Sequence, residues 1–257
     1  MSPRSNLEAV LSRDRIIVVA ALSGVVVLSW LYLLAGAGLG KHDMDGMAMP
    51  SMRMAWSGAY FALMALMWGV MMAAMMLPSA APMILLHSSI YRRRVKESTA
   101  ASAMFVVGYM AVWAGFSIAA TGLQWMLSYA ALLSPMMELS SRALAGILFI
   151  AAGAYQWTPL KQACLRRCRS PLDFIMTHWR EGLGGSFVMG VLHGGFCLGC
   201  CWLLMLLLFV GGLMNFAWIA ALAVFVLVEK LSPAGHWIGR AAGVVLAGWG
   251  IIALASL

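Results

Sequence analysis

Four residues of types that bind soft metals lie close together in an uncharged stretch of the chain, residues 183–228. They occupy positions i, i+4, i+7 and i+8, which fall within an arc of about 100° on an α-helix. The four are His193, Cys197, Cys200 and Cys201, and Met189 extends the same face by one turn. Thiolate, thioether and imidazole groups select Cu(I) or zinc, so this face predicts a soft-metal site. We expect Cu(I) as the metal, with zinc as the alternative.

A straight helix cannot wrap one ion with all four side chains, because His193 and Cys201 stand about 12 Å apart along its axis. Two arrangements remain open. In the first arrangement the helix unwinds at Gly194, Gly195 or Gly199, as helices of transport proteins do where their backbone lines a binding site. Alternatively, only one or two turns bind, and the other ligands come from the methionine-rich second span.

Two other interpretations of the motif stay open. The Cys197-x-x-Cys200 spacing also fits a redox dithiol, which would make the chain a membrane thiol–disulfide oxidoreductase. Small residues such as glycine and cysteine also allow helices to pack closely without any chemistry. The third thiol of Cys201, and His193 one turn away, favour metal binding.

A second candidate ligand set is a methionine stripe in the apolar segment 54–86. Met64, Met67, Met71 and Met75 recur at spacings of three, four and four, with Met72 and Met76 beside them. Such a stripe is typical of adaptable core packing. It also fits a thioether wall facing the cysteine helix.

A third candidate set lies in the short polar loop 41–53. It combines a histidine with closely spaced methionines, a pattern by which flexible loops collect copper. The residues are His42, Met44, Met47 and Met49. A solvated loop in a methionine-rich chain explains the same residues without metal.

Composition sets the class of protein. The chain has 257 residues, of which 63% are hydrophobic and only 10% charged, and its mean hydropathy is +0.90. Soluble domains carry roughly 25% charged residues, so we expect a polytopic membrane protein with the bilayer as its main partner. The net charge of +8 lies in short loops between apolar segments and indicates topology, so no nucleic-acid partner is expected.

The apolar segments predict an all-α membrane bundle of about seven spans, forming one domain over residues 1–257. The second span ends in two prolines, Pro78 and Pro82, which we expect to kink or end its helix. Gly211-Gly212 predicts a tight turn. The predicted spans cover residues 16–40, 54–86, 100–132, 143–160, 186–210, 216–228 and 241–257.

Basic residues orient this bundle. All Lys and Arg residues except Lys41, Arg53 and Arg142 fall on one side if the spans alternate. The positive-inside rule then places the N-terminus in the cytoplasm and the C-terminus outside, in the bacterial inner membrane.

Two polar features lie on the predicted cytoplasmic side. The connection 161–181 holds Cys164 and Cys168, which either share a metal with His178 or are inert. For Glu229, at the inner end of the sixth span, we expect a charge at the membrane interface beside Lys230.

Several motifs together resemble a known family. They are MMAAMMLPS at 71–79, CLRRCRSP at 164–171, HGGFCLGCCW at 193–202, GLMN at 212–215 and EKLSP at 229–233. The chain resembles the predicted metal-binding integral membrane proteins, domain of unknown function 2182, over residues 55 to 250. The resemblance implies metal roles for the motif histidine and cysteines and for the 71–76 methionines.

From the sequence we therefore expect a non-enzymatic protein for copper homeostasis. It would move Cu(I) across the bilayer or deliver it to a partner cuproprotein. The alternatives are the thiol–disulfide oxidoreductase and a non-catalytic subunit of a larger membrane complex.

Overall fold

The computed structural model describes residues 3–35, 56–94, 98–134 and 137–256. Within these ranges the chain is almost entirely helical, and the only β pairing is an isolated bridge between Leu133 and Leu139. The all-α prediction is therefore confirmed. The helices are α1 (Pro3–Leu34), α2 (Gly58–Arg94), α3 (Ser98–Tyr129), α4 (Arg142–Tyr155), α5 (Pro159–Arg169), α6 (Pro171–His178), α7 (Gly182–Leu206), α8 (Leu208–Gly211), α9 (Phe216–Leu231) and α10 (Gly235–Ala255).

Five helices among the described residues are long and apolar enough to cross a membrane. A sixth crossing results if α4 and α5, which bend by 64° at a short break, form one span. Each predicted span overlaps a helix within the described residues. However, α4 has 14 residues and α9 has 16, and a straight crossing needs about 20. Seven crossings and the orientation of the termini thus stay predictions.

Two local features differ from expectation. Pro78 and Pro82 lie inside α2, which continues to Arg94, so of the two outcomes expected for these prolines the helix does not end there, and a kink stays a prediction. Neighbouring helices can support such prolines in an apolar bundle. The connection 161–181 is largely helical, because Thr158 caps α5 through its side chain and Pro159 and Pro171 open α5 and α6.

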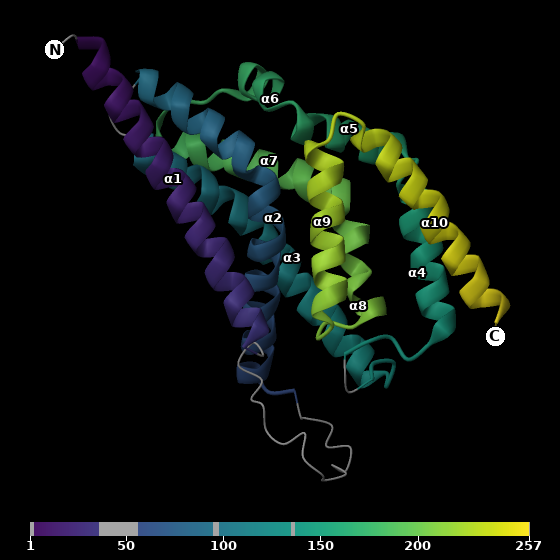
Figure 1. The fold of residues 1–257 in the computed structure, drawn as a ribbon. Helices are drawn as coiled ribbons and strands as arrows, with labels where there is room; N and C mark the ends of the chain where they lie inside the picture. The colour runs from purple at the N-terminus through teal and green to yellow at the C-terminus, as the bar shows by residue number, and fades with distance from the viewer. Residues whose placement is uncertain (1–2, 36–55, 95–97, 135–136, 257) are drawn as a thin grey trace.

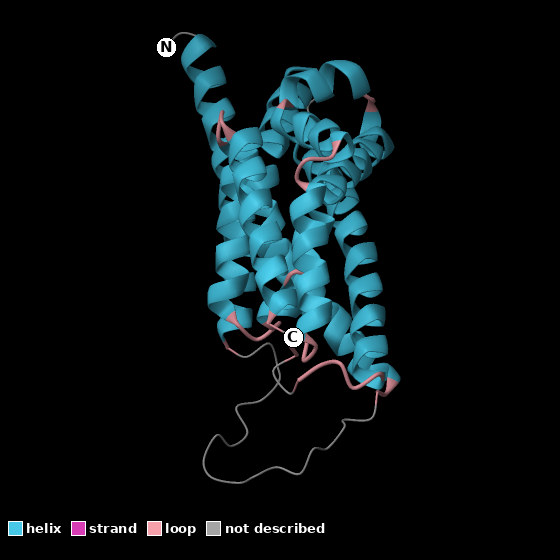
Figure 2. Cartoon of the chain, turned by 90° about the vertical axis from the view of Figure 1, so that its right-hand side faces the viewer, coloured by secondary structure: helices cyan, strands magenta, loops and turns pink. Residues whose placement is uncertain are grey.

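The long helices run side by side, as Figure 2 shows. In Figure 1, α1 lies along α2 on one side of the molecule, and α4 and α10 form the opposite side. Between them lie α3, α7 and α9, and α5 and α6 cross one end of the bundle. The helix pair with the most extensive contact is α3 with α7.

Glycines set how closely α3 and α7 approach. A Cβ on Gly190 would overlap the carbonyl oxygen of Phe105, and one on Gly108 would overlap that of Phe187. Interfaces of this kind are typical of helix packing in membranes, where small residues let backbones touch. This contact fixes the ligand face of α7 against α3.

We expect Gly190→Ala to destabilise the protein by about 1–3 kcal/mol, because the added methyl group must push α3 and α7 apart. The matched control is Gly195→Ala, on the same helix, where a Cβ meets nothing within 4 Å. Thermal unfolding in detergent, followed by circular dichroism, compares the two variants. Equal melting temperatures would show that the close contact does not matter.

Candidate metal centre

The face of α7 that carries the predicted ligands is buried. Met189, His193, Cys197, Cys200 and Cys201 are each at most 2% exposed. The helix is continuous from Gly182 to Leu206, so it does not unwind at any of the motif glycines. The first arrangement left open by the sequence is therefore not seen, and binding by one or two turns with ligands from the second span stays a prediction.

The thiols of α7 gather around one turn. The Sγ atoms of Cys200 and Cys201 donate hydrogen bonds to the carbonyl oxygen of Cys197, at 3.1 and 3.0 Å. From α5, the thiol of Cys168 lies within interaction range of those of Cys197 and Cys200. The sulfur of Cys164 lies against Gly199, where a Cβ would come within 2.8 Å of it. All five cysteines therefore converge where α5 meets α7.

Cys197 has two further polar neighbours. The ammonium of Lys230, on α9, donates to its Sγ at 2.9 Å, and the hydroxyl of Tyr109, on α3, lies 3.0 Å from the same atom. Lys230 also donates to Ser79 at 3.2 Å. Lys230 is only 5% exposed, and the described residues place no carboxylate within ion-pair distance of it. Its ammonium is therefore buried beside a thiol.

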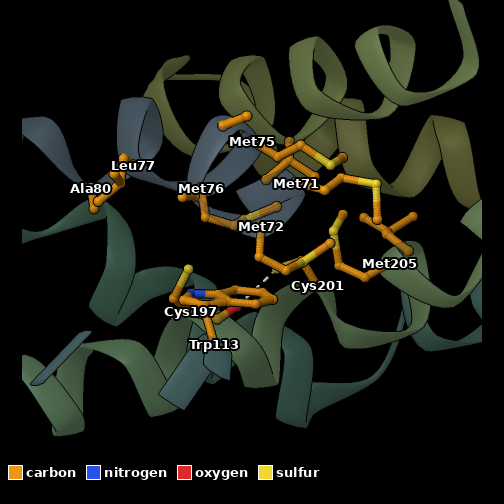
Figure 3. Packing of buried hydrophobic residues seen from close by; sticks show 14 of the residues in the cluster. Met71, Met72, Met75, Met76, Leu77, Ala80, Trp113, Cys197, Cys201 and Met205 are labelled. Atoms are coloured by element: carbon orange, nitrogen blue, oxygen red, sulfur yellow. Dashed lines mark hydrogen bonds between the residues drawn. The ribbon is translucent and has the colours of Figure 1, made fainter. Parts of the chain in front are cut away.

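The methionine stripe of α2 faces this cluster. Met71, Met72, Met75 and Met76 are each at most 1% exposed. Figure 3 shows Met72 and Met76 on the side of α2 that faces Cys197 and Cys201. The Sδ of Met76 lies 3.9 Å from the Lys230 ammonium, and its carbonyl accepts the Tyr109 hydroxyl at 3.2 Å. Thioethers and thiols from two helices thus share one buried region.

His193 lies one helical turn before the thiols on α7. Its ring packs among aromatic rings, with centroids 6.0 Å from Phe105, 5.9 Å from Tyr109 and 5.3 Å from Phe174. Its Nδ1 has no hydrogen-bond partner in the described part of the chain. The Sδ of Met189 accepts the backbone N–H of Arg180 at 3.4 Å. His193 and Met189 therefore form the end of the ligand face away from the cysteines.

Across the described ranges, no three His, Cys, Asp or Glu side chains are grouped so as to hold one metal ion. Methionine sulfur lies outside that set of ligand types. The expectation that Cys164 and Cys168 share a metal with His178 is not the arrangement seen: Cys168 contacts the α7 thiols, whereas the His178 ring stacks on Phe174. The candidate loop ligands His42, Met44, Met47 and Met49 lie outside the described residues.

A buried ion pair fixes α5 over the cluster. The ammonium of Lys161 lies 2.8 Å from one carboxylate oxygen of Glu229 and 3.0 Å from the other, and both side chains are 0% exposed. Arg169, at the end of α5, donates to the carbonyl oxygens of Ser232 and Pro233 at 2.6 and 2.7 Å. Glu229 is therefore buried in an ion pair with Lys161, and its position at the membrane interface stays a prediction.

Sequence reasoning missed four neighbours of the site: Tyr109, Cys168, Lys230 and Ser79. The sequence does contain one signal for Lys230. A second charge directly after Glu229, at the end of an otherwise uncharged run, must point to a different side of the helix, since successive residues differ by about 100°. One of the two charged side chains, Glu229 or Lys230, therefore had to point toward the interior of the bundle.

Comparison with known proteins identifies the family of this chain. A model of the PpoB2 family, described as a copper chaperone, matches residues 65–253. No curated protein and no solved structure matches the chain. The helices and the sulfur-rich centre define a broad class of protein. The family match narrows that class to copper-related proteins. The chain belongs to the copper chaperone family PpoB2.

We expect Glu229→Gln to destabilise the protein by roughly 3–5 kcal/mol, because it leaves the Lys161 charge buried without its partner. The control is Asp173→Asn, which breaks the exposed pair of Asp173 with Arg167 and should cost at most about 1 kcal/mol. Chemical denaturation of both variants measures the difference. A Glu229 variant as stable as the control would show that the pair does not hold α5 in place.

Proposed function

We propose that this protein is a multi-pass inner-membrane protein that binds Cu(I) in the middle of its bundle. It then moves the ion across the bilayer or delivers it to a partner cuproprotein. The copper chaperone family supports a copper-related role, and five long apolar helices support membrane embedding. We further propose a single domain with seven crossings, an internal N-terminus and an external C-terminus.

The observation that carries the proposal is the pairing of Lys230 with Cys197. A buried ammonium is costly unless a negative group neutralises it. In the described part of the chain, the charged carboxylate nearby, Glu229, is already paired with Lys161. The remaining candidate is the Cys197 sulfur at 2.9 Å, which would be a thiolate, the form that binds metal.

Charge balance then favours a monovalent ion. Cu(I) held by two thiolates carries a net charge of −1, which the Lys230 ammonium neutralises within the apolar interior. We propose Cys197 as the central thiolate ligand, with one second thiolate drawn from Cys200, Cys201 and the newly found Cys168. Low-coordinate sulfur sites of this kind favour Cu(I) over zinc.

The methionines provide a route for exchange. Neutral thioethers bind Cu(I) more weakly than thiolates do, so an ion can pass between them one ligand at a time. On α2 the exchange ligands would be Met71, Met72, Met75 and Met76, which lie beside the thiols. At the far end of the α7 face they would be His193 and Met189. His42, Met44, Met47 and Met49 would collect the ion at the outer surface.

Changing Cys197 and Cys201 to serine together should remove the tightly bound copper ion of the thiol cluster, because serine oxygen is a poor Cu(I) ligand. Cys164→Ser is the matched control: its sulfur lies against Gly199 and should be dispensable. Elemental analysis of each purified protein after loading with Cu(I) gives the metal-to-protein ratio. Unchanged copper in the double variant would contradict the site assignment.

Lys230→Met should lower Cu(I) affinity by roughly 10- to 100-fold, the effect of losing one charge-assisted contact of about 1.5–3 kcal/mol. Lys230→Arg keeps the charge and should retain most of the affinity. Competition with a chromophoric Cu(I) chelator measures both. If the two variants bind copper equally well, charge balance by Lys230 is not part of the mechanism.

A thiol–disulfide oxidoreductase would use the same Cys197 and Cys200, and the loading experiment separates the two functions. A redox protein would contain an oxidised pair and retain no copper. A non-catalytic subunit would retain neither copper nor a disulfide and would co-purify with a fixed partner.

A further inference from the structure

A second histidine is buried without a partner. His87, on α2, is 0% exposed, and neither of its ring nitrogens has a hydrogen-bond partner among the described residues. A buried polar group without a partner is unfavourable, and an imidazole with two such nitrogens is unusual in a folded protein. Such a group calls for an explanation, and an absent bound ion is one.

His87 continues the sulfur face of α2. It follows Met83 by four positions and Met76 by eleven, and these spacings place all three on one side of a helix. Met83 and Met76 are each at most 1% exposed. The stripe of soft ligands on α2 therefore runs past the thiol cluster and ends at an imidazole.

The end of the α7 ligand face meets the same region. The rings of His87 and His193 both lie against Phe105, with centroid distances of 4.9 and 6.0 Å. The His87 ring is also 5.8 Å from that of Trp179, and the next residue, Arg180, donates its backbone N–H to the sulfur of Met189. His193, like His87, has a buried ring nitrogen without a described partner.

We propose that His87 is the principal ligand of a second Cu(I) site, with Met189 and His193 as its partners from α7. This inference rests on the proposed function and adds a second metal-binding site between the thiol cluster and the end of the bundle that α6 covers. Imidazole and thioether are both good Cu(I) ligands and both are neutral, so the bound ion keeps its positive charge. Three neighbouring rings, those of Tyr91, Phe105 and Trp179, offer cation–π stabilisation.

The two sites would then differ in strength. The thiolate site, balanced by Lys230, holds the ion tightly. The neutral site around His87 holds it weakly and releases it readily. A tight site next to a weak one is what stepwise passage of a metal requires, since an ion bound only by thiolates would leave slowly.

The test begins with a variant in which Cys197, Cys200 and Cys201 are all serine. Cu(I), supplied as its acetonitrile complex under anaerobic conditions, is titrated into the full-length protein in detergent. We expect this variant to keep about one weakly bound Cu(I) per chain with nitrogen and sulfur neighbours in X-ray absorption spectra. Adding His87→Leu should remove that ion. Adding His236→Leu, a histidine on α10 whose ring lies beside Trp237, should leave it in place.

Two further measurements separate a metal ligand from a packing residue. Without copper, His87→Leu should melt at the same temperature as the parent or higher, because leucine removes unpaired polar atoms from an apolar site. His87→Met, which restores a soft ligand, should retain the second ion. A fall in the metal-free melting temperature of both variants would overturn the proposal and assign His87 to packing.

The outcomes also separate this inference from the proposed function. If the triple serine variant binds no copper while the parent protein does, the second site is refuted and the thiol site stands. If the parent protein itself binds no copper, both fail. Copper that persists in the triple variant after His87→Leu would likewise refute the assignment of His87.

Discussion

The structure depends on two adjacent charges that the apolar interior cannot leave unpaired. Glu229 and Lys230 are both buried near the end of α9, and because they are neighbours on a helix they point in different directions. Glu229 reaches Lys161 and so draws α5 against the bundle. Lys230 reaches Cys197 and so joins α9 to the sulfur face of α7. The same pair therefore holds the scaffold together and gives the thiol cluster its electrostatic partner.

Close packing completes the site that these charges organise. Gly190 lets α7 lie directly on α3, which brings Tyr109 to the Cys197 sulfur. Gly199 leaves room for Cys164, so α5 can approach closely enough for Cys168 to join the cluster. The result is a centre rich in sulfur, assembled from α2, α3, α5, α7 and α9, with one ammonium and one phenol. Such a set suits an ion that is soft and monovalent.

Much of this arrangement could be predicted from local patterns. Apolar length located a helix at each predicted span, helical spacing placed the buried ligand face of α7, and paired glycines predicted the turn at Gly212, where φ is 86°. Contacts between distant segments could not be predicted from such local patterns. Cys168 lies in a polar segment whose approach to α7 depends on the distant Glu229, and Lys230 resembles an interfacial charge in the sequence. The continuous α2 likewise depends on neighbouring helices, since Pro78 and Pro82 locally favour a break.

The most direct test of the account is copper K-edge X-ray absorption on the unmodified protein loaded with one equivalent of Cu(I) in detergent. We predict an edge typical of Cu(I) and a first shell made only of sulfur, because the thiolates beside Lys230 outcompete every neutral site for the first ion. A first shell dominated by nitrogen or oxygen, or a protein that retains no copper, would contradict the assignment of this sulfur cluster as the copper centre.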